Sequence, residues 1–176
     1  GSVIYFSIQA EGEKFTKQAD VIAHPALLRL GVPEERILVA GGTSLHNAYN
    51  RALEWARTKP DLTALVLMHP DLEIIDPEFE AKALAALADP EVAIVGLIGA
   101  AGVWSARWWE GTGLHAGRMH HKPTDKPPGV YFEPRSGEVD VVDGCLLAMA
   151  KSMIERYKAD EKTFSDGWHS CSDDAC

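Results

Sequence analysis

The feature that most constrains the fold is a nearly continuous apolar run, LTALVLM at residues 62–68, that ends abruptly in His69, Pro70 and Asp71. A run without regular polar alternation is typical of a strand buried on both faces, as in the sheet of an α/β protein. Open α/β sheets bind ligands at the carboxyl ends of their strands. The sequence therefore predicts a buried strand whose end presents a histidine and a carboxylate to a ligand or metal.

Apolar runs alternate with helical patterns through the first half of the chain, which predicts βα units around a largely parallel sheet. Apolar residues recur every three or four positions in residues 45–56, so we expect a helix there with Ser44 or Thr43 as its N-cap. Gly31 is expected to end an earlier helix. The expected strands are residues 3–8, 37–40, 62–68 and 92–98, the last buried on both faces, and the expected helices are residues 19–30, 44–58 and 77–88.

The second half changes character. Residues 99–137 are rich in Gly, Pro, Trp and His, which is typical of a functional insertion or a weak hairpin region. Residues 130–133 and 139–142 predict an antiparallel hairpin, and residues 145–157 fit a helix or a strand followed by a helix. The predicted fold is an open, mostly parallel α/β sheet with flanking helices and a small antiparallel hairpin region.

Composition limits the class of protein. With 176 residues, 46% of them hydrophobic, the chain can bury one substantial core, and we expect a single domain. A formal net charge of −9 argues against nucleic acid or an anionic membrane surface as the main partner. Three cysteines without a CxxC pair favour a reducing cytoplasm, and no apolar run approaches the roughly 20 residues of a membrane span. The polar stretch at residues 165–176 stops without a closing element, which leaves open whether the natural protein continues.

An ordered set of motifs carries a resemblance to a known family. The motifs are SLHNAYN at residues 44–50, LVLMHPD at 65–71, VDGCLLAM at 142–149, FSDGWH at 164–169 and DAC at 174–176. Together they resemble bacterial glycosyltransferases of the GT-A fold, in a family-2-like branch, from about residue 37 onward. The resemblance implies a nucleotide-sugar donor across the carboxyl ends of the first strands and a carbohydrate or other hydroxyl acceptor. It also implies Mn²⁺ or Mg²⁺ bridging the diphosphate to an Asp-x-Asp-like motif, and a later carboxylate as base.

The metal position follows from this resemblance. Asp71 stands where an Asp-x-Asp motif would end, with His69 in place of the first carboxylate, and His169 is a second candidate ligand. Hard cations prefer oxygen ligands and complete their shell with phosphates and water, so one carboxylate can suffice. The alternative is that Asp71 caps a turn after Pro70 and His69 only closes the strand.

The donor-binding candidates come from three parts of the chain. Gly41, Gly42 and Ser44 open a helix, where free N–H groups attract phosphate, although the same residues are ordinary in a turn followed by a cap. The resemblance implies that an acidic residue after the second strand reads the nucleotide base, but Ala40 stands at about that place.

Asn50 is a further candidate for donor binding, although with Asn47 it could instead contact neighbouring loops or support the core. Asp143 and Gly144 could orient a sugar hydroxyl and allow its close approach, or could form the turn that leaves a hairpin. The face of Trp168 suits the C–H surface of a sugar, although a disordered chain end would explain this region equally well.

The catalytic base is expected at Asp173 or Asp174. Family members carry acidic residues at the positions that match Ser172 and Asp174, and serine cannot act as a base near neutral pH without a partner. Either the register is shifted or the activity is impaired. A non-catalytic nucleotide- or sugar-binding domain of the same fold is therefore the alternative function.

A zinc hydrolase is a third hypothesis. His115, His120 and His121 could join His169 around zinc, although their spacing matches no compact zinc motif. The cations expected to meet a diphosphate are Arg107, Arg118, Lys122 and Lys126. The tryptophans at positions 104, 108 and 109 are expected to pack the long loop or to line an acceptor cleft.

Overall fold

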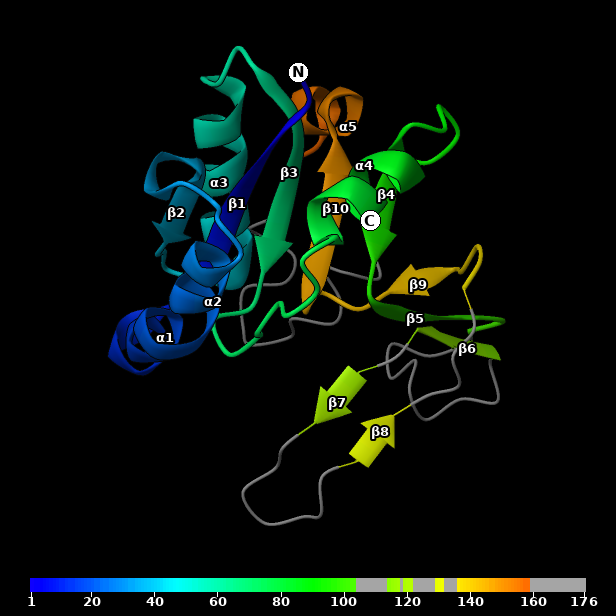
Figure 1. The fold of residues 1–176 in the computed structure, drawn as a ribbon, viewed down its shortest axis with the longest axis horizontal. Coiled ribbons are helices and arrows are strands. Elements are labelled where there is room, and N and C mark those ends of the chain that lie inside the picture. The colour runs from blue at the N-terminus through cyan, green and yellow to red at the C-terminus, as the bar shows by residue number, and fades with distance from the viewer. Residues whose placement is uncertain (104–113, 118, 122–128, 132–135, 159–176) are drawn as a thin grey trace.

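A five-stranded sheet in the order β2-β1-β3-β10-β4 forms the centre of the protein (Figure 1). The computed structural model describes residues 1–103, 114–117, 119–121, 129–131 and 136–158. The strands of the sheet are β1 (Val3–Gln9), β2 (Ile37–Ala40), β3 (Leu62–Met68), β4 (Ile94–Gly96) and β10 (Leu146–Ala150). β1 is parallel to both β2 and β3, whereas β10 is antiparallel to β3 and β4. The predicted open α/β sheet is confirmed, with one reversed strand.

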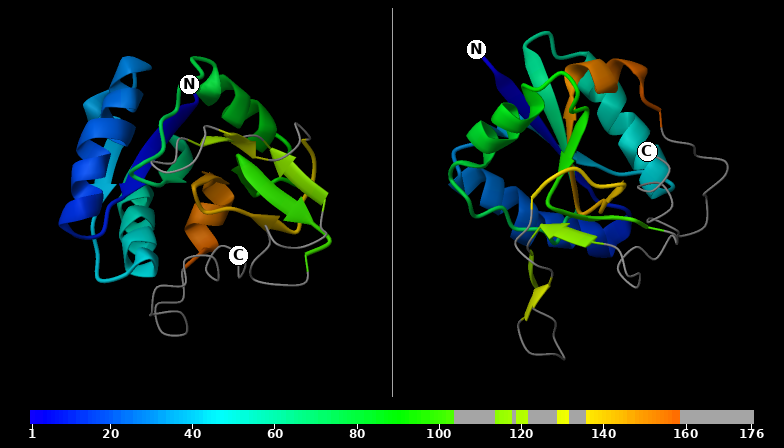
Figure 2. Two further views of the ribbon diagram at one scale, coloured as in Figure 1. Left: turned by 90° about the horizontal axis from the view of Figure 1, so that it is seen from below. Right: turned by 90° about the vertical axis from the view of Figure 1, so that its right-hand side faces the viewer.

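Helices cover both faces of this sheet (Figure 2). They are α1 (Gly12–Gln18), the π-helical turn η1 (Ala19–Ala23), α2 (His24–Arg29), the short 3₁₀ helix η2 (Glu34–Arg36), α3 (Leu45–Arg57), α4 (Phe79–Leu87) and α5 (Lys151–Arg156). Because side chains alternate along a strand, Phe6 of β1 packs with Leu27 of α2 and Ala83 of α4. Tyr5 packs on the opposite face, with Leu53 of α3 and Ile154 of α5.

β3 is the buried strand that the apolar run predicts. Leu65, Val66, Leu67 and Met68 are each 0% exposed, because β1 and β10 flank the strand and helices cover its two faces. Burying large aliphatic side chains contributes roughly 1.5–3 kcal/mol each, so this strand is a main source of folding free energy. Its carboxyl end is therefore a rigid position for the residues that follow.

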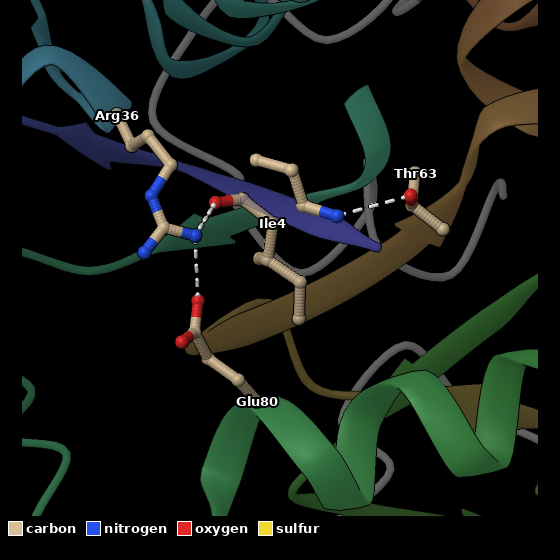
Figure 3. Close-up of polar contacts among 5 residues, drawn as sticks. Ile4, Arg36, Thr63 and Glu80 are labelled. Carbon is tan, nitrogen blue, oxygen red and sulfur yellow. Dashed lines mark hydrogen bonds and ion pairs between the residues drawn. The ribbon is translucent and has the colours of Figure 1, made fainter. Parts of the chain in front are cut away.

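A β-bulge lies at the amino end of β1. Val3 is paired with Leu62 of β3, and the next residue, Ile4, is paired with Ala64. Thr63 is the extra residue between them, and its hydroxyl accepts a hydrogen bond from the Val3 N–H at 3.1 Å (Figure 3). The side chain thus replaces the strand partner that the bulge removes.

Arg36 ties this end of the sheet to a helix. Its Nη1 donates to the Ile4 carbonyl at 3.1 Å and to the Glu80 carboxylate of α4 at 3.0 Å (Figure 3). The Arg36 side chain is only 19% exposed, so these contacts satisfy a largely buried charged group.

The helix expected at residues 19–30 begins earlier than its pattern indicates. The helical segment starts at Gly12, and α1 contains no buried residue, so it shows no apolar period that could reveal it. The expected end is confirmed. Gly31 has a φ of +87°, its N–H donates to the Leu28 carbonyl, and the Val32 N–H donates to the Leu27 carbonyl. The helix expected at 77–88 is α4, which begins two residues later.

The prediction of a single strand at residues 92–98 is wrong. The chain forms β4 and then β5 (Ile98–Ala101), which belong to different sheets. β4 is an edge strand and its residues are only partly buried, so a continuous apolar run here does not mean burial on both faces.

The prediction of a hairpin between residues 130–133 and 139–142 is also wrong. The remaining strands are β6 (Leu114–Gly117), β7 (Met119–His121), β8 (Gly129–Tyr131) and β9 (Val141–Val142). β8 pairs with β7, and β9 pairs with β5 in the sheet β6-β5-β9. The turn signal at 134–137 indicated that these two strands pair with each other, but each pairs with another strand.

No helix in the described part is both long enough and apolar enough to span a bilayer.

Candidate functional site

The carboxyl ends of β1, β2 and β3 lie along one edge of the sheet because these strands are parallel. β10 runs in the opposite direction, so its amino end starts at the same edge. The His69 N–H donates to the Cys145 carbonyl at 3.0 Å, one residue beyond the last paired residues of β3 and β10. This hydrogen bond brings the segments at His69 and Asp143, predicted separately, to one place.

Asp71 follows β3 in a tight turn. The Leu72 N–H donates to the His69 carbonyl at 3.3 Å, and Pro70 is buried below the turn. Asp71 is exposed, and among the described residues none forms a hydrogen bond or an ion pair with its carboxylate. Backbone atoms close the turn without this side chain, so the cap that the alternative interpretation assigned to Asp71 is not formed within the described part.

Glu73, two residues further, is a useful contrast to Asp71. Its carboxylate accepts a hydrogen bond from Arg29 of α2 at 3.1 Å. The chain after β3 therefore carries one carboxylate that holds the loop to a helix and another, Asp71, that faces solvent.

Asp143 and Gly144 form the turn that leads into β10. The Asp143 N–H donates to the Ile98 carbonyl at 2.9 Å, and its Oδ1 accepts from the Cys145 N–H at 2.9 Å. These bonds fix the turn beside His69. Gly144 is buried and Asp143 is partly exposed, so a ligand could reach this carboxylate from the edge of the sheet. Sugar binding by these two residues stays a prediction.

The loop at residues 41–44 connects β2 to α3 and is held by its own helix. Ser44 is the N-cap, as predicted, because its hydroxyl accepts from the Asn47 N–H at 3.1 Å. The Asn47 carboxamide in turn accepts from the Thr43 N–H at 3.2 Å, so of the two alternatives for Asn47 the structure shows the contact with a neighbouring loop. Arg51 Nη1 donates to the Gly41 carbonyl at 3.0 Å.

Gly42 is required by close packing in this loop. A Cβ at this position would lie 2.5 Å from Asn47 Oδ1 and 3.0 Å from the Ala48 nitrogen. At Gly41, by contrast, the nearest atom would be the Ala10 carbonyl oxygen at 3.6 Å, an ordinary contact. A side chain would thus fit at the first glycine, whereas the second must be glycine for the loop to lie against α3. Phosphate binding by either one stays a prediction.

Buried polar residues gather between β1 and α3. Within the described residues, the buried polar side chains are Ser7 and Gln9 of β1 and His46 and Asn50 of α3. Ser7 and Gln9 share the face of β1 that carries Tyr5 and packs against α3. Gln9 Nε2 donates to the Ser7 hydroxyl at 2.9 Å.

Ser7 and Gln9 are not among the residues predicted from the sequence, although polar residues at alternate positions of an apolar strand could have indicated them. Asn50 is only 7% exposed, and the structure does not test its predicted contact with the donor.

Several predicted site residues fall outside the described residues. These are Trp168, His169, Asp173 and Asp174, with the cations Arg107, Arg118, Lys122 and Lys126. For the zinc hypothesis, the backbones of His115, His120 and His121 lie in β6 and β7, but their side chains are not described. Among the residues the structure describes, no three His, Cys, Asp or Glu side chains form a group that could hold a metal ion.

Comparison with known proteins adds independent information. The sequence profile of a glycosyltransferase-like family matches residues 9–175, which is most of the chain. The chain belongs to this glycosyltransferase-like family. The match begins at the last residue of β1 and runs beyond α5, so the glycosyltransferase-like region contains every site segment described above.

The chain is also similar, at low identity, to a curated protein. The chain is 27% identical over 138 residues to the streptomycin biosynthesis protein StrF of Streptomyces griseus. The alignment covers 78% of this glycosyltransferase-like chain and 47% of the relative, so the chain spans about half the length of StrF.

Proposed function

We propose that this domain transfers a hexosyl group from a nucleoside diphosphate sugar to a hydroxyl acceptor, assisted by Mn²⁺ or Mg²⁺. The observation that carries the proposal is the exposed Asp71 carboxylate, which follows the central strand of a glycosyltransferase-like domain and has no partner among the described residues. Asp71 stands at the edge of the sheet where ligands of open α/β proteins bind. The relation to StrF is consistent with carbohydrate chemistry but specifies neither donor nor acceptor.

The chemistry of Asp71 suits a cation that a diphosphate also holds. One carboxylate with no other ligand among the described residues falls short of the three or four protein ligands that zinc sites use. It is compatible with Mg²⁺ or Mn²⁺, whose remaining positions are filled by phosphate oxygens and water. Asp71 would hold this cation, with His169 as the second proposed ligand, and the bound cation would offset charge on the departing diphosphate.

Arg51 supplies a positive charge near the proposed phosphates. The net charge of −9 repels a diphosphate, so a local cation is needed. Arg51 is exposed, and its bond to the Gly41 carbonyl places the guanidinium beside the loop that opens α3. Its remaining N–H groups are suited to phosphate oxygens. Arg51 therefore joins Gly41, Gly42 and Ser44 as a proposed donor-binding residue.

The proposed reaction follows the inverting route. The acceptor hydroxyl oxygen attacks the anomeric carbon, and the bond from that carbon to the diphosphate oxygen breaks, so the nucleoside diphosphate leaves with the electron pair. The hydroxyl proton passes to a carboxylate, for which Asp173 and Asp174 are the candidates. On the acceptor side, Asp143 would orient sugar hydroxyls and Trp168 would stack on a ring face.

Calorimetry with UDP and with GDP, each in the presence of Mn²⁺, tests the donor site. We expect one of them to bind, and binding to weaken at least about tenfold in Asp71→Asn, since the variant removes the charged oxygen ligand of the cation. EDTA should have the same effect.

Glu73→Gln is the matched control, because it neutralises an exposed carboxylate two residues away that already pairs with Arg29. Its nucleotide affinity should stay within about twofold of wild type, as is usual for a surface charge outside the site. A folded wild-type protein that binds neither nucleotide would refute the proposal.

The alternative function is a domain that binds the nucleotide or the sugar without catalysis. The observation that favours it is Ser172, which stands where the resemblance implies an acidic residue. Donor hydrolysis and transfer assays on Asp173→Asn and Asp174→Asn separate the two functions. A catalytic domain loses turnover in one variant with nucleotide affinity retained, whereas a binding domain shows no turnover even as wild type.

A further inference from the structure

A cavity of about 1030 Å³ lies beside the free edge of the five-stranded sheet. Its walls are the end of α4, the edge strand β4, the start of β5 and residues 136–139. Figure 1 shows β4 at one side of the sheet, next to β5 and β9. The volume is at the upper end of the range typical of small-molecule sites.

The lining of this cavity is mainly apolar. Ile94, Val95 and Leu97 are only partly buried, and they line the cavity together with Val139 and Val142. β4 is the last strand of its sheet, so its outer backbone edge has no strand partner among the described residues. Val95 and Leu97 lie on the face of the sheet that packs with α4, whereas Ile94 and Val142 lie on the other. A ligand with an apolar body would cover Val95 and Leu97 and could also bond to the strand edge.

Two glycines make the inner wall tight and fixed in shape. A Cβ on Gly96 would lie 2.0 Å from Val142 Cγ1, and one on Gly99 would lie 2.2 Å from the Val141 carbonyl oxygen. The wall is therefore closely packed at both glycines and leaves no room for a side chain there. Because Val142 precedes Asp143 and the Asp143 N–H binds the Ile98 carbonyl, this wall continues directly into the candidate site.

The charged residues in the described lining of the cavity have one sign. Asp89, Glu91 and Glu138 line it and are exposed, whereas no lysine, arginine or histidine is among its described lining residues. Three carboxylates around an apolar wall complement a cation and repel an anion. A nucleoside diphosphate is thus a poor occupant.

We propose that this cavity binds an organic amine, with its apolar body against Val95 and Leu97 and its ammonium group toward the acidic residues of the lining, which are Asp89, Glu91 and Glu138. The continuous wall from the cavity to Asp143 makes this amine the acceptor, a role that rests on the proposed function. The binding itself does not depend on that function. An acceptor that carries an amino group would be drawn to its site by the same acidic charge that disfavours the donor there.

Benzylamine and benzyl alcohol form a matched pair of probes, because they share an aromatic body and differ in charge at neutral pH. We expect benzylamine to bind about five- to tenfold more tightly, as a few partly exposed charge contacts allow. In NMR titrations of the full chain, the amide shifts should concentrate at residues 94–99 and 137–142.

A triple variant removes the charge and keeps the shape. Asp89→Asn retains an oxygen for the Glu91 N–H, which now donates to Asp89 Oδ1 at 2.9 Å, and Glu91→Gln and Glu138→Gln are isosteric. Benzylamine should then bind as weakly as benzyl alcohol, with nucleotide affinity unchanged. The control variant combines Glu35→Gln, Glu54→Gln and Glu155→Gln, which remove three exposed carboxylates that do not line the cavity. It should still bind benzylamine more tightly than benzyl alcohol.

Equal affinity for benzylamine and benzyl alcohol would overturn the proposal whether or not nucleotide binds. Changes in amide chemical shift that lie elsewhere on the protein would overturn it too. A protein that prefers benzylamine but fails to bind UDP and GDP would keep the amine site and refute the donor site. A short peptide of alternating lysine and valine that binds more tightly than benzylamine, with shifts confined to β4, would assign the groove to an extended protein segment instead and so contradict a small amine.

Discussion

At the scale of single residues, neighbours in sequence have different tasks at the edge of the sheet. Asp71 faces solvent and has no partner among the described residues, whereas Glu73 binds Arg29. Gly41 and Gly42 are both glycines of one loop, but a side chain fits at the first and collides at the second. Residue type predicted Asp71, Gly41 and Gly42 as possible ligand contacts, and it does not separate the two members of either pair. The surrounding atoms decide which member is available to a ligand and which one supports the loop.

Replacing Gly42 with alanine should destabilise the protein by about 1–3 kcal/mol, the usual range for an overpacked position. The new Cβ would displace the Asn47 side chain and break its bond to the Thr43 N–H. Urea denaturation measures the change in the free energy of unfolding.

Gly41→Ala is the control for this change, because its Cβ meets only an ordinary contact, and we expect its stability to stay within about 0.5 kcal/mol of wild type or slightly above. Adding Asn47→Ala to Gly42→Ala should recover part of the loss, since it removes the colliding oxygen. Equal effects of Gly41→Ala and Gly42→Ala would contradict the packing argument.

At the scale of elements, side chains repair the places where regular hydrogen bonding is interrupted. Thr63 replaces a strand partner at the bulge, Ser44 caps α3, and Arg36 binds the Ile4 carbonyl while it holds α4 through Glu80. Local sequence predicts the cap, because serine before an apolar helical pattern is a known signal. It does not predict the bulge or the Arg36 contact, since both depend on strands and helices that meet only in the folded protein.

Arg36→Ala should cost about 1.5–3 kcal/mol, because it removes two hydrogen bonds of a largely buried charged group. Thermal or urea unfolding gives this value. The exposed pair of Arg29 and Glu73 provides the control, and Arg29→Ala should change stability by less than about 0.5 kcal/mol.

A double-mutant cycle with Glu80→Gln isolates the ion pair between Arg36 and Glu80. We expect a coupling of at most about 1 kcal/mol, since the Glu80 side chain is 39% exposed. A coupling as large as the whole Arg36→Ala effect would mean that the bond to the Ile4 carbonyl contributes nothing.

At the scale of the whole molecule, one reversed strand assembles the candidate site. Three parallel strands end at a common edge, and antiparallel β10 starts there, so Asp143 arrives beside His69 from a distant part of the chain. Long-range pairing of this kind joins β1, β3 and β10 into the most buried part of the protein. The helices outside this centre differ greatly in burial, and α1 contributes no buried residue.

Amide hydrogen exchange should follow this difference. The amides of β3 from Leu65 to Met68 should exchange most slowly, at rates set by global unfolding, because their residues are fully buried and their strand has partners on both sides. Amides of α1 should exchange by local opening, at least about a hundredfold faster, since that helix can open without exposing a core residue. Uniform protection across α1 and β3 would contradict this.

By itself, the sequence determined the elements whose signals are local. Periodicity and caps predicted α3, the end of α2 at Gly31 and the buried strand β3, and the ordered motifs predicted the glycosyltransferase-like family. Each of these signals lies within a few residues, so it can be recognised without knowing how the rest of the chain folds.

Only the tertiary structure decided how the strands pair and which polar groups stay open to a ligand. It reversed β10, separated β4 from β5, and paired β8 with the preceding β7 and β9 with the distant β5 in place of the expected hairpin. It also buried Gln9 and left Asp71 exposed, although both follow apolar stretches of their strands. The physical reason is that strand pairing and burial are set by the packing of segments far apart in the sequence, which no local pattern records.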